Sequence, residues 1–82
     1  SQQAYTVHLS PNPFQYTCIL DAPEAISYTL MDSKGVILNQ SSFANYPTPI
    51  LGAELSTGFY ILQINYKDHI QTLPLIKQYG SQ

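Results

Sequence analysis

Apolar and polar residues alternate along most of this chain, in short runs that end at turn-forming residues. Side chains of a β-strand point to opposite faces in turn, whereas an amphipathic helix repeats its apolar positions at about every third or fourth residue. The alternating runs are residues 5–9, 14–20, 26–30 and 58–66. The sequence therefore predicts an all-β protein.

The same alternation predicts which face of each strand is buried. Hydrophobic residues make up 44% of the chain, enough to form a core rather than a disordered tail. The side chains expected in that core share one phase within their runs: Phe14, Tyr16, Cys18, Leu20, Ile26, Tyr28, Leu30, Tyr60, Leu62 and Ile64. The run 58–66 begins apolar on both faces, so we expect it in the interior of its sheet.

Turn residues separate the runs and limit the topology. Residues 31–35 are expected to form a hairpin turn, because Asp32 can bond to nearby backbone and Gly35 can take a positive φ without a Cβ clash. The alternation then decays over residues 41–52, where two prolines remove backbone donors, so we expect a connection between sheets with one short strand around Ile50.

The last predicted strand, residues 69–77, follows a turn at Lys67 and Asp68. Pro74 lies inside it, and because proline cannot donate to a ladder, this strand is expected at a sheet edge or a bulge. Six or seven short strands, with turns about every 8 to 12 residues, predict a small antiparallel β-sandwich.

The scarcity of charge excludes several partners. Charged residues are 10% of the chain, three of them basic, and the net charge is −2. Nucleic acid and anionic lipid both need clustered Lys or Arg, so neither is an expected partner. The apolar stretch 59–62 is far shorter than the ~20 residues that span a bilayer, so we predict no membrane insertion.

No catalytic or metal-binding group is predicted. His8 and His69 lack the close spacing of zinc ligands, although they would be neighbours if the first and last strands met. Cys18 lies on the apolar phase of its strand and is expected in the core, and as the single cysteine it cannot form an intramolecular disulfide. The acidic residues stand singly at predicted strand ends and turns: Asp21, Glu24, Asp32, Glu54 and Asp68. We therefore expect a chain that is not an enzyme and has no cofactor.

The ten aromatic residues suggest an alternative, a carbohydrate-binding or adhesive module of a secreted enzyme. Its stacking platform would use Phe43, Tyr46, Tyr66 and Tyr79, which lie in the irregular segment or near turns. The chain has no Trp, the residue with the largest apolar face for such stacking. A passive spacer domain is a third interpretation.

Three segments, in their order along the chain, carry a family resemblance. They are residues 9–14 (LSPNPF), 26–35 (ISYTLMDSKG) and 55–64 (LSTGFYILQI), followed by LIKQ at residues 75–78. The set resembles the C-terminal sorting domain of type IX secretion cargo, the Por secretion system tail, type A.

The resemblance implies an immunoglobulin-like sandwich of about seven strands. Residues 1–82 would form a single sorting domain, excised from a longer precursor of a secreted or surface protein of Bacteroidota. The domain would direct an upstream cargo protein through the type IX translocon across the outer membrane, passing the periplasm in transit. A sortase-like protease would then cleave it, leaving the cargo on the cell surface or released from the cell. In that step the domain would be the substrate and not the catalyst.

The motif residues are expected to act through the fold: Pro11, Asn12, Pro13, Asp32, Gly35, Gly58 and Tyr60. The two prolines of the first motif cannot continue a central ladder, so this segment could let the first strand leave one sheet and join the other. Gly58 would let Tyr60 enter the core with its hydroxyl on a backbone group.

Sorting information is expected at the last strand. An edge strand offers unpaired N–H and C=O groups that a partner can extend by strand addition. The residues expected to be recognised are Leu73, Leu75, Ile76, Lys77 and Gln78.

Overall fold

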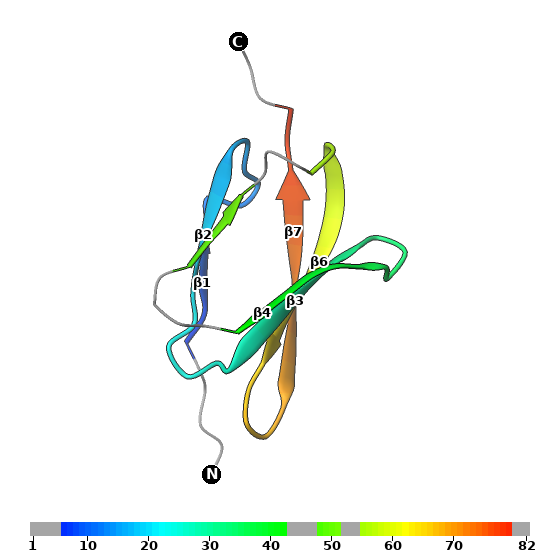
Figure 1. Cartoon of the computed structure of the whole chain (residues 1–82). Coiled ribbons are helices and arrows are strands. Elements are labelled where there is room, and N and C mark those ends of the chain that lie inside the picture. The colour runs from blue at the N-terminus through cyan, green and yellow to red at the C-terminus, as the bar shows by residue number, and fades with distance from the viewer. Residues whose placement is uncertain (1–5, 43–47, 52–54, 80–82) are drawn as a thin grey trace.

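The structure is a computed structural model that describes residues 6–42, 48–51 and 55–79. These residues form seven strands and no helix (Figure 1). The strands are β1 (His8–Ser10), β2 (Thr17–Asp21), β3 (Ser27–Asp32), β4 (Ile37–Ser42), β5 (Thr48–Leu51), β6 (Gly58–Asn65) and β7 (Ile70–Lys77). The prediction of an all-β chain with about seven strands is confirmed.

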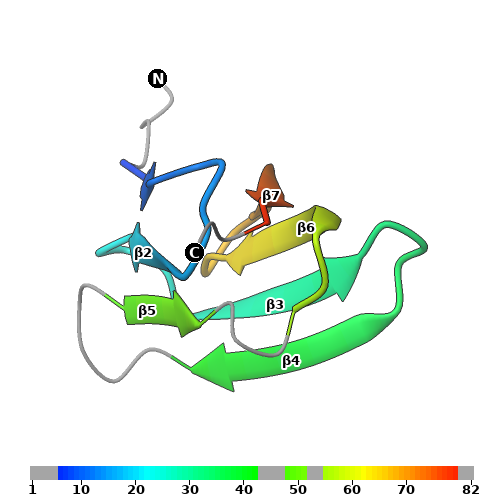
Figure 2. The same cartoon turned by 90° about the horizontal axis from the view of Figure 1, so that it is seen from above.

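The strands pack as two antiparallel sheets, one in the order β1-β2-β5 and the other in the order β4-β3-β6-β7. Figure 2 shows the two layers facing one another, with β1 and β7 on one side of the sandwich and β4 and β5 on the other. β6 lies inside its sheet and β7 at its edge, as the apolar faces of the first and Pro74 of the second predicted. The short strand expected around Ile50 is β5, which pairs with β2.

The core lies between the sheets and is built mainly from the predicted phase. The buried apolar side chains are Phe14, Cys18, Leu20, Ala22, Ala25, Tyr28, Leu30, Ile50, Tyr60, Leu62, Ile64, Tyr66 and Leu75. Burial of this apolar area is the main force that holds the two sheets together.

Two residues expected in this core lie outside it. Tyr16 is 63% exposed and Ile26 is 56% exposed. Each stands one residue before its strand begins, at Thr17 and Ser27, so the strand's alternation does not reach it.

The β3–β4 turn has the expected chemistry. The Asp32 carboxylate accepts hydrogen bonds from the backbone N–H of Lys34 at 2.9 Å and of Val36 at 3.0 Å. Gly35 has φ of 88°, where a Cβ would be strained. The turn is therefore fixed by one carboxylate and one glycine.

Tyr60 is buried on β6, two residues after Gly58, whose φ is 153°. The Tyr60 hydroxyl donates to the Ser56 carbonyl oxygen at 2.6 Å, which is the backbone contact expected from the sequence. A buried hydroxyl without such a partner would cost about 1–3 kcal/mol, so this bond allows a tyrosine in the core.

Candidate functional site

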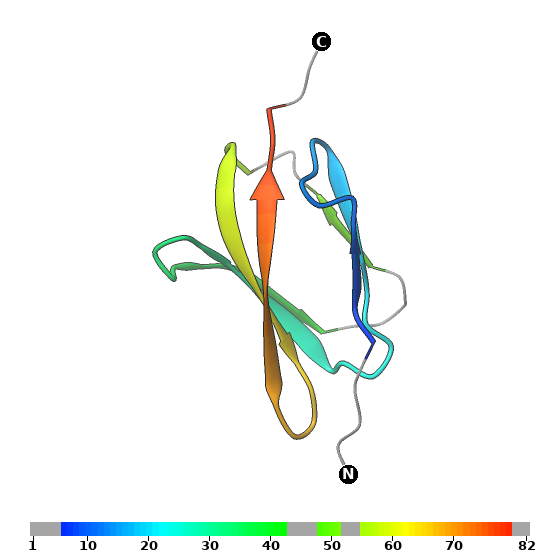
Figure 3. The ribbon, with the colours of Figure 1, turned by 180° about the vertical axis from the view of Figure 1, so that it is seen from behind.

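The candidate site is the outer edge of β7. One side of this strand pairs with β6 over its whole length, from Ile70 opposite Asn65 to Lys77 opposite Gly58. On the other side, residues 11–14 leave β1, approach the end of β7 and return to β2, as Figure 3 shows. We call residues 11–14 the Pro-Asn-Pro clamp.

The clamp makes four hydrogen bonds to the edge of β7 and the residue that follows it. The Asn12 carboxamide donates to the Pro74 carbonyl at 2.9 Å and accepts from the Ile76 N–H at 3.1 Å. Phe14 continues the pattern with its backbone, donating to the Ile76 carbonyl at 2.9 Å and accepting from the Gln78 N–H at 2.7 Å. Asn12 thus replaces a peptide group with its side chain, and Phe14 forms a parallel bridge opposite Lys77.

This geometry corrects two expectations. The first is that the Pro-Asn-Pro segment transfers the first strand from one sheet to the other. β1 and β2 both belong to the three-stranded sheet, and the segment between them bonds to the four-stranded one only through the Asn12 side chain and the backbone of Phe14. The second is that the edge from Leu73 to Gln78 has unpaired backbone groups. The N–H and carbonyl of Ile76, the Gln78 N–H and the Pro74 carbonyl are already bonded to the clamp.

The N-terminal half of the edge is open. In an antiparallel ladder, successive residues direct their N–H and C=O alternately toward one neighbour and the other. Ile76 bonds outward, so Ile70 and Thr72 also direct their backbone groups away from β6. Among the described residues, nothing bonds to these outward groups. The clamp therefore divides β7 into a covered half and an open half.

The five predicted recognition residues lie in different environments. Leu75 is 0% exposed and belongs to the core, and Leu73 is partly buried against it. Ile76 is 39% exposed on the outer face of the sheet, where it is the cross-strand partner of Phe59. Lys77 is half-buried and its amine donates to the Gln78 carbonyl at 3.3 Å, while the Gln78 side chain is exposed. Only Ile76 and Gln78 have exposed side chains.

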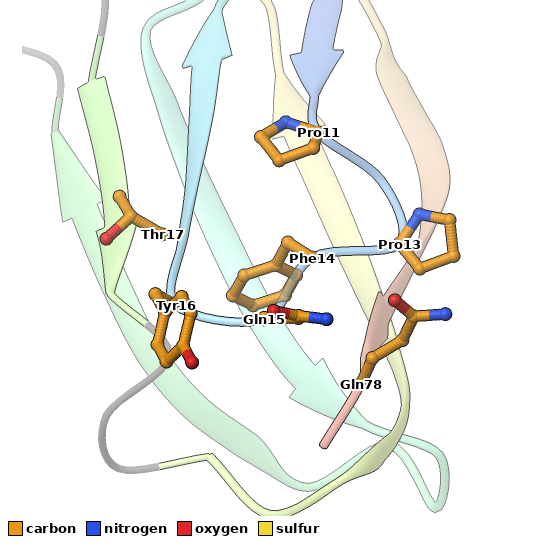
Figure 4. Close-up of a pocket in the computed structure, with 7 residues that line it drawn as sticks. All are labelled: Pro11, Pro13, Phe14, Gln15, Tyr16, Thr17 and Gln78. Carbon is orange, nitrogen blue, oxygen red and sulfur yellow. The ribbon is translucent and has the colours of Figure 1, made fainter. Parts of the chain in front are cut away.

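A surface hollow of about 430 Å³ adjoins the clamp (Figure 4). Its lining residues are uncharged: Pro11, Pro13, Phe14, Gln15, Tyr16, Thr17 and Gln78. The sequence singled out Pro11 and Pro13 as motif residues and Gln78 as a recognition residue. It placed Tyr16 in the core, did not single out Gln15, and did not predict the bonds that Asn12 makes to β7. The available signal was an asparagine between two prolines, since it alone of the three can both donate and accept.

The other candidate groups do not assemble into a site. His8 lies on β1 and His69 in the β6–β7 turn, and these strands belong to different sheets. His69 bonds to Asp68 at 2.8 Å, and this bond lowers the pKa of the Asp68 carboxyl. No three His, Cys, Asp or Glu side chains gather as metal ligands within residues 6–42, 48–51 and 55–79. Nor does this part of the chain contain a helix with the length and apolar character needed to cross a membrane.

The aromatic platform is not supported by the placement of Tyr66. This residue is buried, and its ring stacks on the His69 ring with centroids 4.6 Å apart. Tyr79 is exposed, but Phe43 and Tyr46 lie outside the described residues. Of the four expected stacking residues, the described part of the chain therefore exposes Tyr79 alone.

Cys18 is fully buried on β2, and burial raises the pKa of its thiol from 9.0 to about 11. At pH 8 only about a thousandth of the folded thiols are ionised. We expect a thiol-reactive disulfide reagent to label the folded domain at least ten times more slowly than the chain in urea, as followed by absorbance. Equal labelling rates in the two states would show that Cys18 is not held in the core.

The raised pKa of Cys18 also makes the stability of the domain depend on pH. The neutral, buried thiol contributes to the free energy of unfolding below pH 9, and this contribution is lost as the pH rises from 9 to about 11.

The described residues form a small antiparallel β-sandwich in which one sheet edge is partly covered by a segment of the same chain and partly open. The sequence model of the secretion system C-terminal sorting domain matches residues 8–78. The chain belongs to this family, the non-catalytic signal domains that direct cargo secretion by the Por (type IX) system. A comparison with curated proteins gave no match.

Proposed function

We propose that residues 1–82 form one sorting domain of type A at the C-terminal end of a longer precursor. The observation that carries this proposal is the family match over residues 8–78, which includes all seven strands. A domain of this family interacts with the type IX machinery, and its cargo crosses the outer membrane. The translocon and a sortase-like protease are the proposed partners.

The proposed recognition surface is the C-terminal end of β7. Among the five recognition residues, Leu73 and Leu75 act by holding β7 on the core, since their side chains face inward. Ile76, Lys77 and Gln78 supply the contacts, with Ile76 offering an exposed apolar side chain next to Phe59. The low charge of the chain favours recognition by shape and apolar contact over recognition by an electrostatic field.

The remaining steps follow from the same role. The domain and its cargo pass through the periplasm, and after passage the sortase-like protease cleaves the domain from the cargo. The cargo then stays on the cell surface or is released into the medium. Cleavage requires an accessible peptide bond between the cargo and the domain.

A reporter fusion tests the proposed function. Residues 1–82 would be fused to the C-terminus of a reporter that carries its own signal for export to the periplasm, in a bacterium with the type IX system. We expect the reporter on the surface or in the medium, and in the periplasm of a translocon-deficient strain. A fused reporter that stays in the periplasm of the intact strain would overturn the proposal.

A further inference from the structure

The open half of the β7 edge differs from the other free edge of the same sheet. Gln40 on β4 and Thr72 on β7 stand at the two ends of one cross-strand row, which runs through Thr29 and Gln63. By the alternation of the ladder, Gln40 and Thr72 both direct their N–H groups away from the sheet. The two edges thus offer the same backbone groups in the same row.

Their surroundings are different. The β4 residues around Gln40 are polar, Asn39, Ser41 and Ser42, so a strand added there would bury little apolar area. Leu73 on β7, and Val7 and Leu9 at β1 of the facing sheet, pack against the core and are only partly buried. Figure 2 shows that β1 and β7 border the same side of the sandwich, and the two strands do not pair with each other. Further burial of apolar area is therefore available at the β7 edge.

We propose that the open half of β7 is a docking site for an extended peptide segment of the secretion machinery. The segment pairs with the outward N–H and C=O groups of Ile70 and Thr72, because only another strand repeats these groups at a two-residue spacing. Its inward side chains are apolar, since they would lie over Val7, Leu9 and Leu73, where a charge would lose its water. This inference rests on the proposed function and specifies how the partner binds.

The clamp fixes where the added strand ends. Pro74 has no N–H, its carbonyl is bonded to Asn12, and the next outward groups belong to Ile76, which the clamp also occupies. A partner strand therefore cannot extend past Thr72 without displacing Asn12. The register of docking is defined by this limit, with Ile70 and Thr72 inside the contact and Ile76 outside it.

Three matched variants test the docking site in the reporter fusion. Thr72→Pro removes one of the two outward donors in the open half of β7 and leaves the β6–β7 ladder intact, as Pro74 already does in the same phase. Thr72→Val changes the exposed side chain but keeps the donor. Gln40→Pro removes the corresponding donor from the β4 edge. We expect secretion to fall about tenfold with Thr72→Pro only, because a blocked strand contact loses its hydrogen bonds and its close approach.

Further readings separate the possible outcomes. Unfolding midpoints of the purified variants show whether each one folds. Should Thr72→Pro fail to fold, Gln71→Lys is used, because it places a charge at the half-buried inward position next to Thr72 and should lower secretion similarly. If the parent fusion is secreted and every folded variant is secreted equally, the docking site is wrong while the proposed function stands. If the parent domain is a dimer and Thr72→Pro makes it monomeric, a second copy occupies the edge and the proposal is overturned.

Discussion

Replacing Phe14 by alanine should lower the free energy of unfolding by about 3–5 kcal/mol. Phe14 is 1% exposed and is among the largest fully buried side chains, so its removal leaves a cavity between the sheets. A protein of this size has roughly 5–15 kcal/mol of total stability, and a loss of this size would leave a marginal fold. Equilibrium unfolding in urea, followed by tyrosine fluorescence, measures the difference.

Tyr16→Ala is the matched control for this variant. Tyr16 is an aromatic residue of the same loop, two positions further on, but it is 63% exposed. Its truncation should change the free energy of unfolding by less than about 1 kcal/mol. Similar effects of the two substitutions would mean that the clamp does not anchor in the core. The comparison is informative because the sequence alone assigned both residues to the buried face.

The pair Phe14 and Tyr16 also shows how far the sequence could predict this fold. Alternation predicted the strands, the interior position of β6 and most of the core, because those depend on local period and apolar burial. It failed at Tyr16 and Ile26, where the chain has not yet entered the strand. The alternation of a run predicts which side chains are buried only from the residue at which the strand pairs with its neighbour. Where that pairing begins depends on residues far away in the sequence.

The candidate site was harder to predict for a related reason. Pro74 correctly indicated an edge, but the bonding of that edge depends on Asn12, which is 62 residues away in sequence. The turn residues Asp32 and Gly35 were predictable because their bonds are local. A side chain that replaces a strand on a distant edge produces no periodic signal. The division of β7 into covered and open halves therefore required the tertiary structure.

Substitutions at two neighbouring residues of β7 should distinguish a loss of stability from a loss of recognition. Leu75→Ala removes a fully buried side chain and should cost about 2–5 kcal/mol. Ile76→Ala removes a side chain that is 39% exposed on the outer face and should cost about 1 kcal/mol or less. Urea unfolding of the purified domains measures both values.

In the reporter fusion the two variants should fail for different reasons. Leu75→Ala should lower secretion in proportion to the unfolded fraction, since the core side chain of Leu75 cannot touch a partner while the domain is folded. Ile76→Ala should remain folded and still lower secretion several-fold, because its apolar side chain next to Phe59 is available for contact. Normal secretion of a folded Ile76→Ala fusion would remove Ile76 from the recognition surface. Recognition would then depend on Lys77, Gln78 and the open backbone of Ile70 and Thr72.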